Sequence, residues 1–331
     1  MLDLERLGRI RLRARPPFQR FVARVLLTPN YGFPPGVEIV FEGLEHLPSE
    51  PCVFAMNHTD RFNYWPFQFE LYRRRDRFTA TWVKGKYYES PTVGLFMEHT
   101  NNIPTVSRGY VITRDFLSTL GRRPSDAEYR ALRGWVNAVA LGDAAQPPDE
   151  IPREMLTQVR SILGRRYYPR RESYAQAIDG VFRLMMRRFV ELNDEAAALG
   201  LDLLVFPEGT RSIRLSKGRP GLSQIAMHLE RPLVPVGCSG SDRLYPGSSP
   251  VAKPGRVVYR FGEPLRREQA KAWVERGAFE PFTAEAERAH GDAFQTYIDD
   301  VMQRIEPLLD PEYRPAEQID ADAVEGSKRF V

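Results

Sequence analysis

The chain has few cysteines, few histidines and no long hydrophobic run. Its two cysteines among 331 residues, Cys52 and Cys238, lie in separate apolar runs, which favours buried free thiols in a reducing compartment over a disulfide. Arginines interrupt the first thirty positions, so no apolar run there approaches the roughly twenty residues that a bilayer span requires. The sequence therefore predicts neither a disulfide framework nor a membrane-spanning N-terminus, and we expect a cytoplasmic protein.

The numbers of positive and negative residues are nearly equal, but their distribution is uneven. Lys and Arg number 47 against 43 Asp and Glu, yet arginines cluster near residues 6–24, 160–171 and 183–188. Such clusters favour an anionic partner. No basic stretch carries a recognisable nucleic-acid motif, and aromatic residues do not alternate with the arginines as a base-stacking surface requires. We therefore expect a membrane surface, and no nucleic acid, as a partner.

Residues 1–36 are expected to form an N-terminal amphipathic helical arm. From Phe18 onward, apolar residues recur at helical spacing, while Arg20 and Arg24 share the polar side. This pattern is typical of a helix that lies in a membrane interface. A helix docked on the protein core is an equal alternative. The apolar stripe consists of Phe18, Phe21, Val22, Val25 and Leu26.

Beyond the arm, strand and helix patterns alternate, which predicts an α/β domain over residues 37–310. Short apolar runs indicate strands of a mixed, largely parallel sheet flanked by helices. We expect residues 110–171 to be a helical insertion in this domain and residues 311–331 to be a loose C-terminal tail. The strand-like runs are 37–41, 52–56, 78–83, 103–106, 203–206, 233–236 and 257–261.

Apolar residues spaced three and four apart predict the longest helices. Two such stripes cover residues 178–189 and 294–309, and both are expected to face the core. Within the insertion, the same spacing predicts one helix around residues 129–139 and another around residues 155–162.

Two polar loops each follow a buried strand-like run. Residues 57–63 come directly after the run at 52–56, and the heptapeptide 206–212 closes the run at 203–206. Loops at strand ends are where α/β sheets bind ligands. The two loops are therefore expected to share one site.

The side chains of these loops suit proton transfer and anion binding. Of five histidines, His58 is the one that follows an apolar strand, and its imidazole could take a proton from a substrate hydroxyl if a partner fixes its tautomer. Asp60 and Asn63 are the candidate partners. Arg211 offers a planar fork suited to a phosphate, and Glu208 could hold that fork or bind a hydroxyl. The alternative for Glu208 and Arg211 is a surface ion pair in a turn.

These segments carry a resemblance to a known family. Asn57-His58, with Asn63 five positions after the histidine, and Phe206-Pro207-Glu208-Gly209-Thr210-Arg211-Ser212 resemble the first and third motifs of the 1-acylglycerol-3-phosphate (lysophosphatidic acid) acyltransferases and related glycerolipid acyltransferases. Lys84, in the segment 83–94, and Arg108 resemble the family's second block. The segment 233–236 resembles its fourth motif. The resemblance covers about residues 37–109 and 201–264, outside the insertion and both termini.

The resemblance implies a glycerolipid acyltransferase-like fold and transfer of a fatty acyl group from acyl-CoA or acyl-carrier protein to a lysophospholipid hydroxyl, such as that of 1-acylglycerol-3-phosphate. It implies no metal and no bound cofactor, and a protein peripheral on the inner face of the membrane. His58 is then the general base. The implied substrate-binding residues are Glu208, Gly209, Thr210, Arg211, Arg108 and Lys84.

The sequence departs from the family at one position of the His-x4-Asp motif. The family has Asp five residues after the histidine, where this chain has Asn63. An Asn carbonyl can still accept a hydrogen bond from the imidazole, and Asp60 could supply the charge; Asn63 could also cap the following helix. Three hypotheses follow: a working acyltransferase, a catalytically impaired lipid-binding relative, and a transacylase or hydrolase acting on lysolipids.

Overall fold

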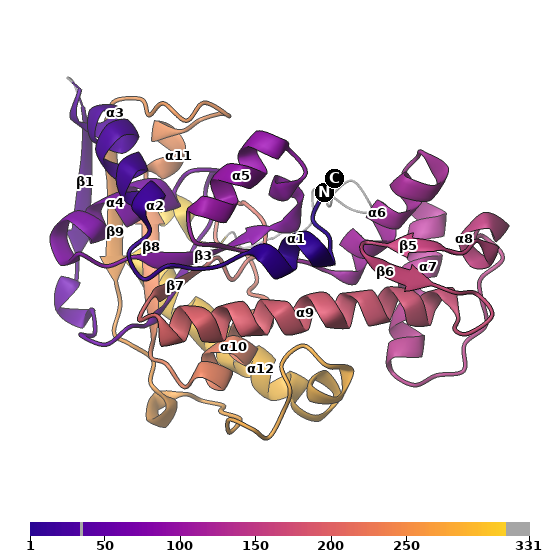
Figure 1. Ribbon diagram of the computed structural model, residues 1–331. Helices are drawn as coiled ribbons and strands as arrows, with labels where there is room; N and C mark the ends of the chain where they lie inside the picture. The colour runs from indigo at the N-terminus through magenta and orange to yellow at the C-terminus, as the bar shows by residue number, and fades with distance from the viewer. Residues whose placement is uncertain (34–35, 316–331) are drawn as a thin grey trace.

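A seven-stranded sheet forms the centre of the molecule, for which a computed structural model describes residues 1–33 and 36–315 (Figure 1). All seven strand-like runs of the sequence form strands of this sheet. The strands are β1 (Val37–Glu42), β2 (Val53–Met56), β3 (Thr79–Lys84), β4 (Asn102–Thr105), β7 (Asp202–Val205), β8 (Leu233–Ser239) and β9 (Gly255–Phe261).

The sheet is mixed and largely parallel, as the sequence predicted. Its strand order is β1-β9-β8-β2-β7-β3-β4, and every neighbouring pair is parallel except β8 with β9. The central strand β2 pairs with β7 and β8, so that Val53 lies between Leu203 and Leu233. The carboxyl ends of β2, β7, β3 and β4 therefore meet at one edge of the sheet.

Helices cover both faces of the sheet, which explains why β2 is apolar throughout. Val53 and Ala55 pack into one core cluster with α9, α10 and α12, whereas Phe54 and Met56 pack into a second cluster with α4. These helices are α4 (Tyr64–Arg75), α9 (Tyr174–Ala198), α10 (Gly221–Leu229) and α12 (Ala284–Ile305). The two predicted long helices, α9 and α12, are thus confirmed, and both bury their apolar stripes.

The segment between β4 and α9 contains helices and one hairpin at the end of the molecule away from β1 (Figure 1). The helix expected around residues 129–139 is present as α7. The prediction of a helix around residues 155–162 is wrong beyond Thr157, where a hairpin takes its place. Leu163 and Gly164 both have positive φ and form a two-residue turn between its two short antiparallel strands. The elements are α6 (Arg108–Leu120), α7 (Asp126–Ala140), α8 (Arg153–Thr157), β5 (Arg160–Ile162) and β6 (Arg165–Tyr167).

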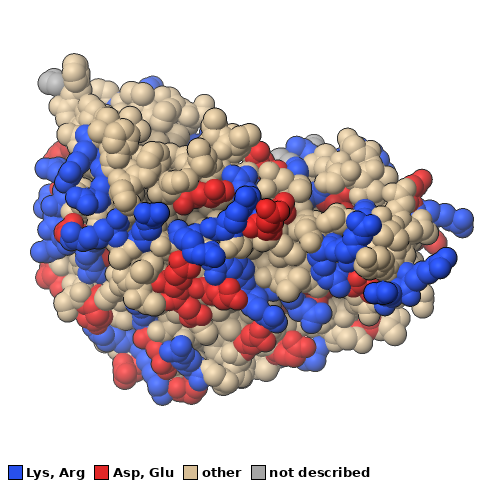
Figure 2. Space-filling view, in the orientation of Figure 1, with Lys and Arg blue, Asp and Glu red and all other residues tan. Residues whose placement is uncertain are grey.

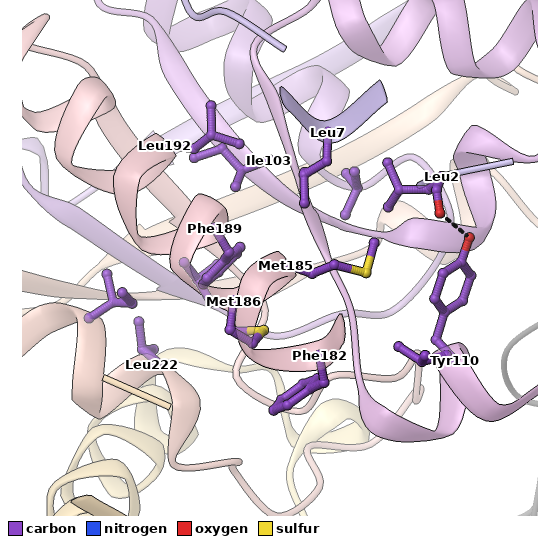
Figure 3. Close-up of a cluster of buried hydrophobic side chains, with 14 of the residues drawn as sticks. Leu2, Leu7, Ile103, Tyr110, Phe182, Met185, Met186, Phe189, Leu192 and Leu222 are labelled. Atoms are coloured by element: carbon purple, nitrogen blue, oxygen red, sulfur yellow. Dashed lines mark hydrogen bonds between the residues drawn. The ribbon is translucent and has the colours of Figure 1, made fainter. Parts of the chain in front are cut away.

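The first thirty-three residues pack against the domain through two separate parts. Leu2 and Leu7 are buried in the cluster that contains α9, so α1 (Leu4–Arg9) belongs to the core (Figure 3). The second part runs without a break through α2 (Pro17–Phe21), a π-helix (Val22–Leu27) and α3 (Thr28–Gly32). The bond from the Thr28 amide to the Ala23 carbonyl spans five residues and marks the π-helical turn.

The apolar stripe of this second part divides between core and surface. Val22 is buried, but Phe18, Phe21, Val25 and Leu26 remain exposed; Phe21 and Leu26 are each 52% exposed. The upper edge of the molecule in Figure 2, over α3 and α5 (Pro91–His99) in Figure 1, is correspondingly poor in charged side chains. The helix is therefore docked on one side and apolar on the other.

The remaining elements are short. They are the 3-10 turns Leu44–His46, Gly85–Tyr88, Arg267–Gln269, Glu306–Leu308 and Pro311–Tyr313, and α11 (Ser241–Leu244). Tyr313, in the segment expected to be loose, is buried, and its hydroxyl donates to Asp242; residues 316–331 lie outside the described range. Within the described residues, every helix is too short or too polar to cross a membrane.

Candidate functional site

Asn57 fastens the start of the first polar loop to the sheet. Its side chain accepts a hydrogen bond from the Cys238 amide at 2.7 Å and donates to the Cys238 carbonyl at 2.9 Å. Cys238 belongs to β8, the neighbour of β2. The buried thiols of Cys52 and Cys238 are both free, as the sequence predicted. These two hydrogen bonds fix the backbone that leads into the next residue, His58.

The His58 imidazole has a defined orientation and a defined tautomer. Asn63 donates from Nδ2 to the Asn57 carbonyl oxygen at 2.9 Å, so its Oδ1 faces the ring and accepts from His58 Nδ1 at 3.1 Å. The Nδ1 atom therefore carries the hydrogen and Nε2 keeps a free lone pair. Phe206, from the second loop, stacks on the ring at a centroid distance of 4.1 Å.

Asn63 contacts His58 although it occupies the N-cap position of α4. Its side chain makes no capping hydrogen bond, so the capping alternative is not realised. The hydroxyl of Tyr259 donates to the Asn63 carbonyl oxygen at 2.6 Å and fixes the backbone there. Both polar atoms of the Asn63 amide are thus used in positioning the imidazole.

Asp60 lies close to His58 in sequence but is used elsewhere. Its carboxylate accepts hydrogen bonds from the Phe62 amide at 2.7 Å and from the Thr59 hydroxyl at 2.9 Å. Burial raises the pKa of Asp60, and these bonds lower it. The structure therefore does not bring this carboxylate to Nδ1 of His58, where Asn63 already accepts.

Glu208 joins the two loops through hydrogen bonds of its carboxylate. It is 1% exposed; one carboxylate oxygen accepts from the His58 amide, and the other accepts from the amide and the hydroxyl of Ser216, each at 2.8 Å. The Ser212 amide donates to the His58 carbonyl oxygen, also at 2.8 Å. Glu208 therefore differs from the sequence prediction: it positions His58 and the 206–216 loop, and it does not line the cavity.

The electrostatic surroundings keep His58 neutral. Burial lowers its pKa most, the hydrogen bond to Asn63 raises it, and the charges of Arg211 and Lys84 lower it further, to about 3. Burial also raises the pKa of Glu208 to about 7, against the three hydrogen bonds that lower it. At neutral pH the imidazole is therefore available as a proton acceptor, but a weak one.

His58 faces a cavity of about 870 Å³. Its apolar wall includes Trp82 of β3, Phe282, and the stripe Phe182, Met186 and Phe189 along one side of α9, part of which Figure 3 shows. Among the described residues, no Asp or Glu lines this cavity. Seven cationic residues do: Arg61, Lys84, Lys86, Arg108, Arg133, Arg211 and Arg219.

The predicted binding residues are only partly gathered here. Gly209 and Arg211 line the cavity, and the positive φ of Gly209, 69°, suits a glycine at this turn. Lys84 lines it from the end of β3, whereas Thr210 does not line it. Arg108 lines it as well, but its guanidinium pairs with Asp179 at 2.8 Å and lies 4.5 Å from the Phe182 ring centroid.

Sequence reasoning missed four cavity cations, Arg61, Lys86, Arg133 and Arg219, and the role of Phe206. Arg61 lies inside the first loop, and Lys86 lies two residues after Lys84, so both could have been found by their position. Burial and the charges of Arg211 and Arg61 lower the pKa of Lys86, which places these cations together. The position of Arg133 in the sequence gave no such indication, because it lies in the insertion, away from both polar loops.

Comparisons with known proteins add little to this geometry. The sequence matches no family model and no curated protein. One solved structure that resembles the chain is the 1-acyl-sn-glycerophosphate (LPA) acyltransferase PlsC from Thermotoga maritima, with 16% sequence identity and a TM-score of 0.39, over 92% of this chain and 79% of that chain. A likeness of this size carries no weight, so the chemistry rests on the residues themselves. Within the described residues, no group of three or more His, Cys, Asp or Glu side chains is placed to hold a metal ion.

Proposed function

We propose that the protein is an acyltransferase that moves a fatty acyl group from a thioester, acyl-CoA or acyl-carrier protein, to the hydroxyl of a lysophospholipid such as 1-acylglycerol-3-phosphate. One observation carries the proposal: the neutral, oriented imidazole of His58 opens into a cavity that combines an apolar wall with cations and no carboxylate. An amphiphile with a fatty chain and a phosphate matches this combination.

His58 acts as the general base in this proposal. Its free Nε2 takes the proton of the acceptor hydroxyl as the oxygen attacks the thioester carbonyl, and the thiol leaves. Nδ1 remains bonded to Asn63, which keeps the ring in place. Because a thioester is already a good electrophile, alignment of the two substrates and removal of one proton supply most of what the reaction needs.

The acceptor phosphate is assigned to the cations whose charges lower the pKa of His58. In 1-acylglycerol-3-phosphate the reacting hydroxyl and the phosphate sit on adjacent carbons, so the phosphate must lie close to Nε2. Arg211 and Lys84 are the cations whose charges act on His58, and Arg211 also acts on Lys86. Among the described residues, Arg211 and Lys86 form no ion pair, which leaves their charge for a ligand.

One observation favours a second candidate function. Asn63 gives no negative charge to stabilise the imidazolium that forms in the reaction, and in a serine-hydrolase triad the same replacement costs about four orders of magnitude in turnover. A lipid-binding relative that kept the cavity and lost turnover would need only the apolar wall and the cations. A transacylase or hydrolase would use the same His58 on a lysolipid or on water.

An acceptor-dependence assay separates these functions. Purified protein is incubated with an acyl thioester, with and without 1-acylglycerol-3-phosphate, and thiol release is followed beside His58→Ala. Release that requires the acceptor and His58 supports the acyltransferase. Release without the acceptor indicates hydrolysis, and tight lipid binding without release indicates the binding protein.

A membrane surface is the proposed partner, met from the cytoplasmic side at the inner face. The exposed side chains Phe18, Phe21, Val25 and Leu26 support this proposal, because a two-sided apolar helix docked on a protein suits insertion into an interface. Phe18 contacts Phe96, a residue of the cavity wall, at a ring distance of 5.8 Å. The apolar surface therefore reaches the cavity, where a lipid acceptor has to arrive.

A further inference from the structure

The cavity has a second end that lies away from His58. Its wall follows α9 through Phe182, Met186 and Phe189, a stripe about 10 Å long (Figure 3). Arg108 lies over the Phe182 ring and therefore marks the end of the stripe nearest the insertion. His58 follows β2, and Arg108 follows β4. These two strands are three strand spacings apart in the sheet, or about 14 Å.

Arg133 is the uncompensated charge at this second end. It lies on α7, which packs on α6 and α9, and it lines the cavity. Its Nε is buried and has no hydrogen-bond acceptor, and the guanidinium forms no ion pair within residues 1–33 and 36–315. Arg108, by contrast, is neutralised by Asp179. The side chain as a whole is partly buried. Because it is costly to leave its buried Nε–H without an acceptor, an anion from outside the chain would stabilise this position.

We propose that Arg133 binds the phosphate of the acyl donor, at the end of the pantetheine arm. This inference rests on the proposed function and deepens it, since it names the donor subsite. The acceptor phosphate must lie next to its reacting hydroxyl and is therefore confined to the His58 end. A donor phosphate is separated from the thioester by the long, uncharged pantetheine arm, and the wall between the two ends, free of Asp and Glu in the described residues, accommodates such an arm.

The subsite belongs to the insertion and not to the two polar loops. Its donors are the guanidinium N–H groups of Arg133, whose planar fork fits a phosphate. Coenzyme A and acyl-carrier protein both carry a phosphate at this point of the pantetheine arm, in a diphosphate or in a phosphoserine linkage. The shared chemistry is therefore phosphopantetheine, and the test distinguishes its two sources.

Calorimetric titration of the full chain tests the subsite without turnover. Coenzyme A and glycerol 3-phosphate are titrated into wild type, Arg133→Leu, Arg133→Gln and Arg130→Leu. Arg130 lies on the same helix, is exposed and does not line the cavity, so it is a matched control for the loss of one charge. We expect Arg133→Leu and Arg133→Gln to raise the Kd for coenzyme A at least tenfold, to leave the Kd for glycerol 3-phosphate within twofold, and Arg130→Leu to change neither.

The source of the phosphate is resolved by two further titrants, 4′-phosphopantetheine and holo-acyl-carrier protein. Weakened binding of all three in the Arg133 variants supports contact with the phosphate they share. Weakening confined to coenzyme A, an unchanged Kd in both variants, a change only for glycerol 3-phosphate, or no binding of any donor by wild type would each overturn the proposal. Acceptor-dependent turnover with an unchanged donor KM in Arg133→Gln would overturn this inference alone and leave the acyltransferase standing.

Discussion

His58 donates from Nδ1 to the side-chain oxygen of Asn63, 3.1 Å away, where a carboxylate would form a charged pair. The geometry that orients the ring is therefore present, and the charge is missing. A carboxylate at this position favours the protonated imidazole, whereas the amide of Asn63 gives only the dipole of its carbonyl. The orientation of the His58 ring and its basicity therefore depend on different features of this chain, and each can be changed alone.

Replacing Asn63 with Asp should raise both the basicity of His58 and the rate of acyl transfer. A carboxylate at hydrogen-bond distance raises the pKa of the imidazole from about 3 by about 1–3 pH units. The acid limb of kcat/KM should move up by that interval, and kcat at neutral pH should rise by at least about tenfold. Initial rates between pH 3 and 8, with thiol release as the signal, measure both.

The Asp substitution also removes a donor, which gives the experiment its control. Asn63 Nδ2 donates to the Asn57 carbonyl, and a carboxylate oxygen there would face that acceptor at a cost of about 1–3 kcal/mol. The unfolding free energy is therefore measured alongside, and Asn63→Ala serves as the variant that loses orientation without gaining charge. An acid limb that stays in place in a folded Asn63→Asp protein would show that the base is not His58.

The strands, and the placing of His58 and the second loop in one site, could be predicted from local patterns. The hydrogen-bond partners of the side chains in this site could not. Buried runs such as 52–56 and 203–206 need both faces covered, and this requirement is visible in the sequence. The sequence does not show whether Asp60 or Asn63 is the partner of the imidazole, because this depends on how the turn at 59–62 directs each side chain.

Three further differences left no signal in the local sequence pattern. Glu208 was expected to touch the substrate, but the Ser216 amide, eight residues later, takes its second oxygen. The hairpin at Leu163-Gly164 was hidden because a leucine with φ of 46° departs from the glycine and asparagine that usually mark such turns. Arg133 reaches the cavity only through the packing of α7, which no local pattern gives.

Replacing Arg211 with Ala should weaken the acceptor and leave the donor nearly unchanged. A charge-assisted hydrogen bond to phosphate contributes about 1.5–3 kcal/mol, which corresponds to an acceptor KM about 10–150 times higher. Because Arg211 also lowers the pKa of His58, the acid limb should move slightly upward. Steady-state kinetics with both substrates varied give the two KM values, and Arg214→Ala, exposed and absent from the cavity wall, is the control. An unchanged acceptor KM argues against a phosphate at Arg211.

Charges placed on the exposed side of the arm should prevent membrane binding. Phe21 and Val25 are each about half exposed, so transfer of their exposed halves to an apolar phase contributes roughly 1.5–3 kcal/mol in total. The double variant Phe21→Glu with Val25→Glu should therefore lower partitioning onto anionic vesicles by at least about tenfold in a sedimentation assay. Leu141→Glu, at an exposed site after α7, controls for added charge. Equal partitioning of the double variant and wild type would assign these side chains no part in membrane binding.

Glu208 should make the stability of the fold fall with rising pH. Its pKa in the folded state is about 7, above the ordinary value of 4.5, so the folded protein holds this proton more tightly than the unfolded chain does. The resulting stabilisation, about 3 kcal/mol, is fully present below pH 4.5 and is lost as the pH rises through 7. Glu208→Gln cannot ionise and provides the reference, because both proteins keep His58 and its own pH dependence. Urea unfolding from pH 4.5 to 8.5 should show the free energy of wild type declining relative to Glu208→Gln, while parallel curves would mean that the three hydrogen bonds to the carboxylate already offset the cost of its burial.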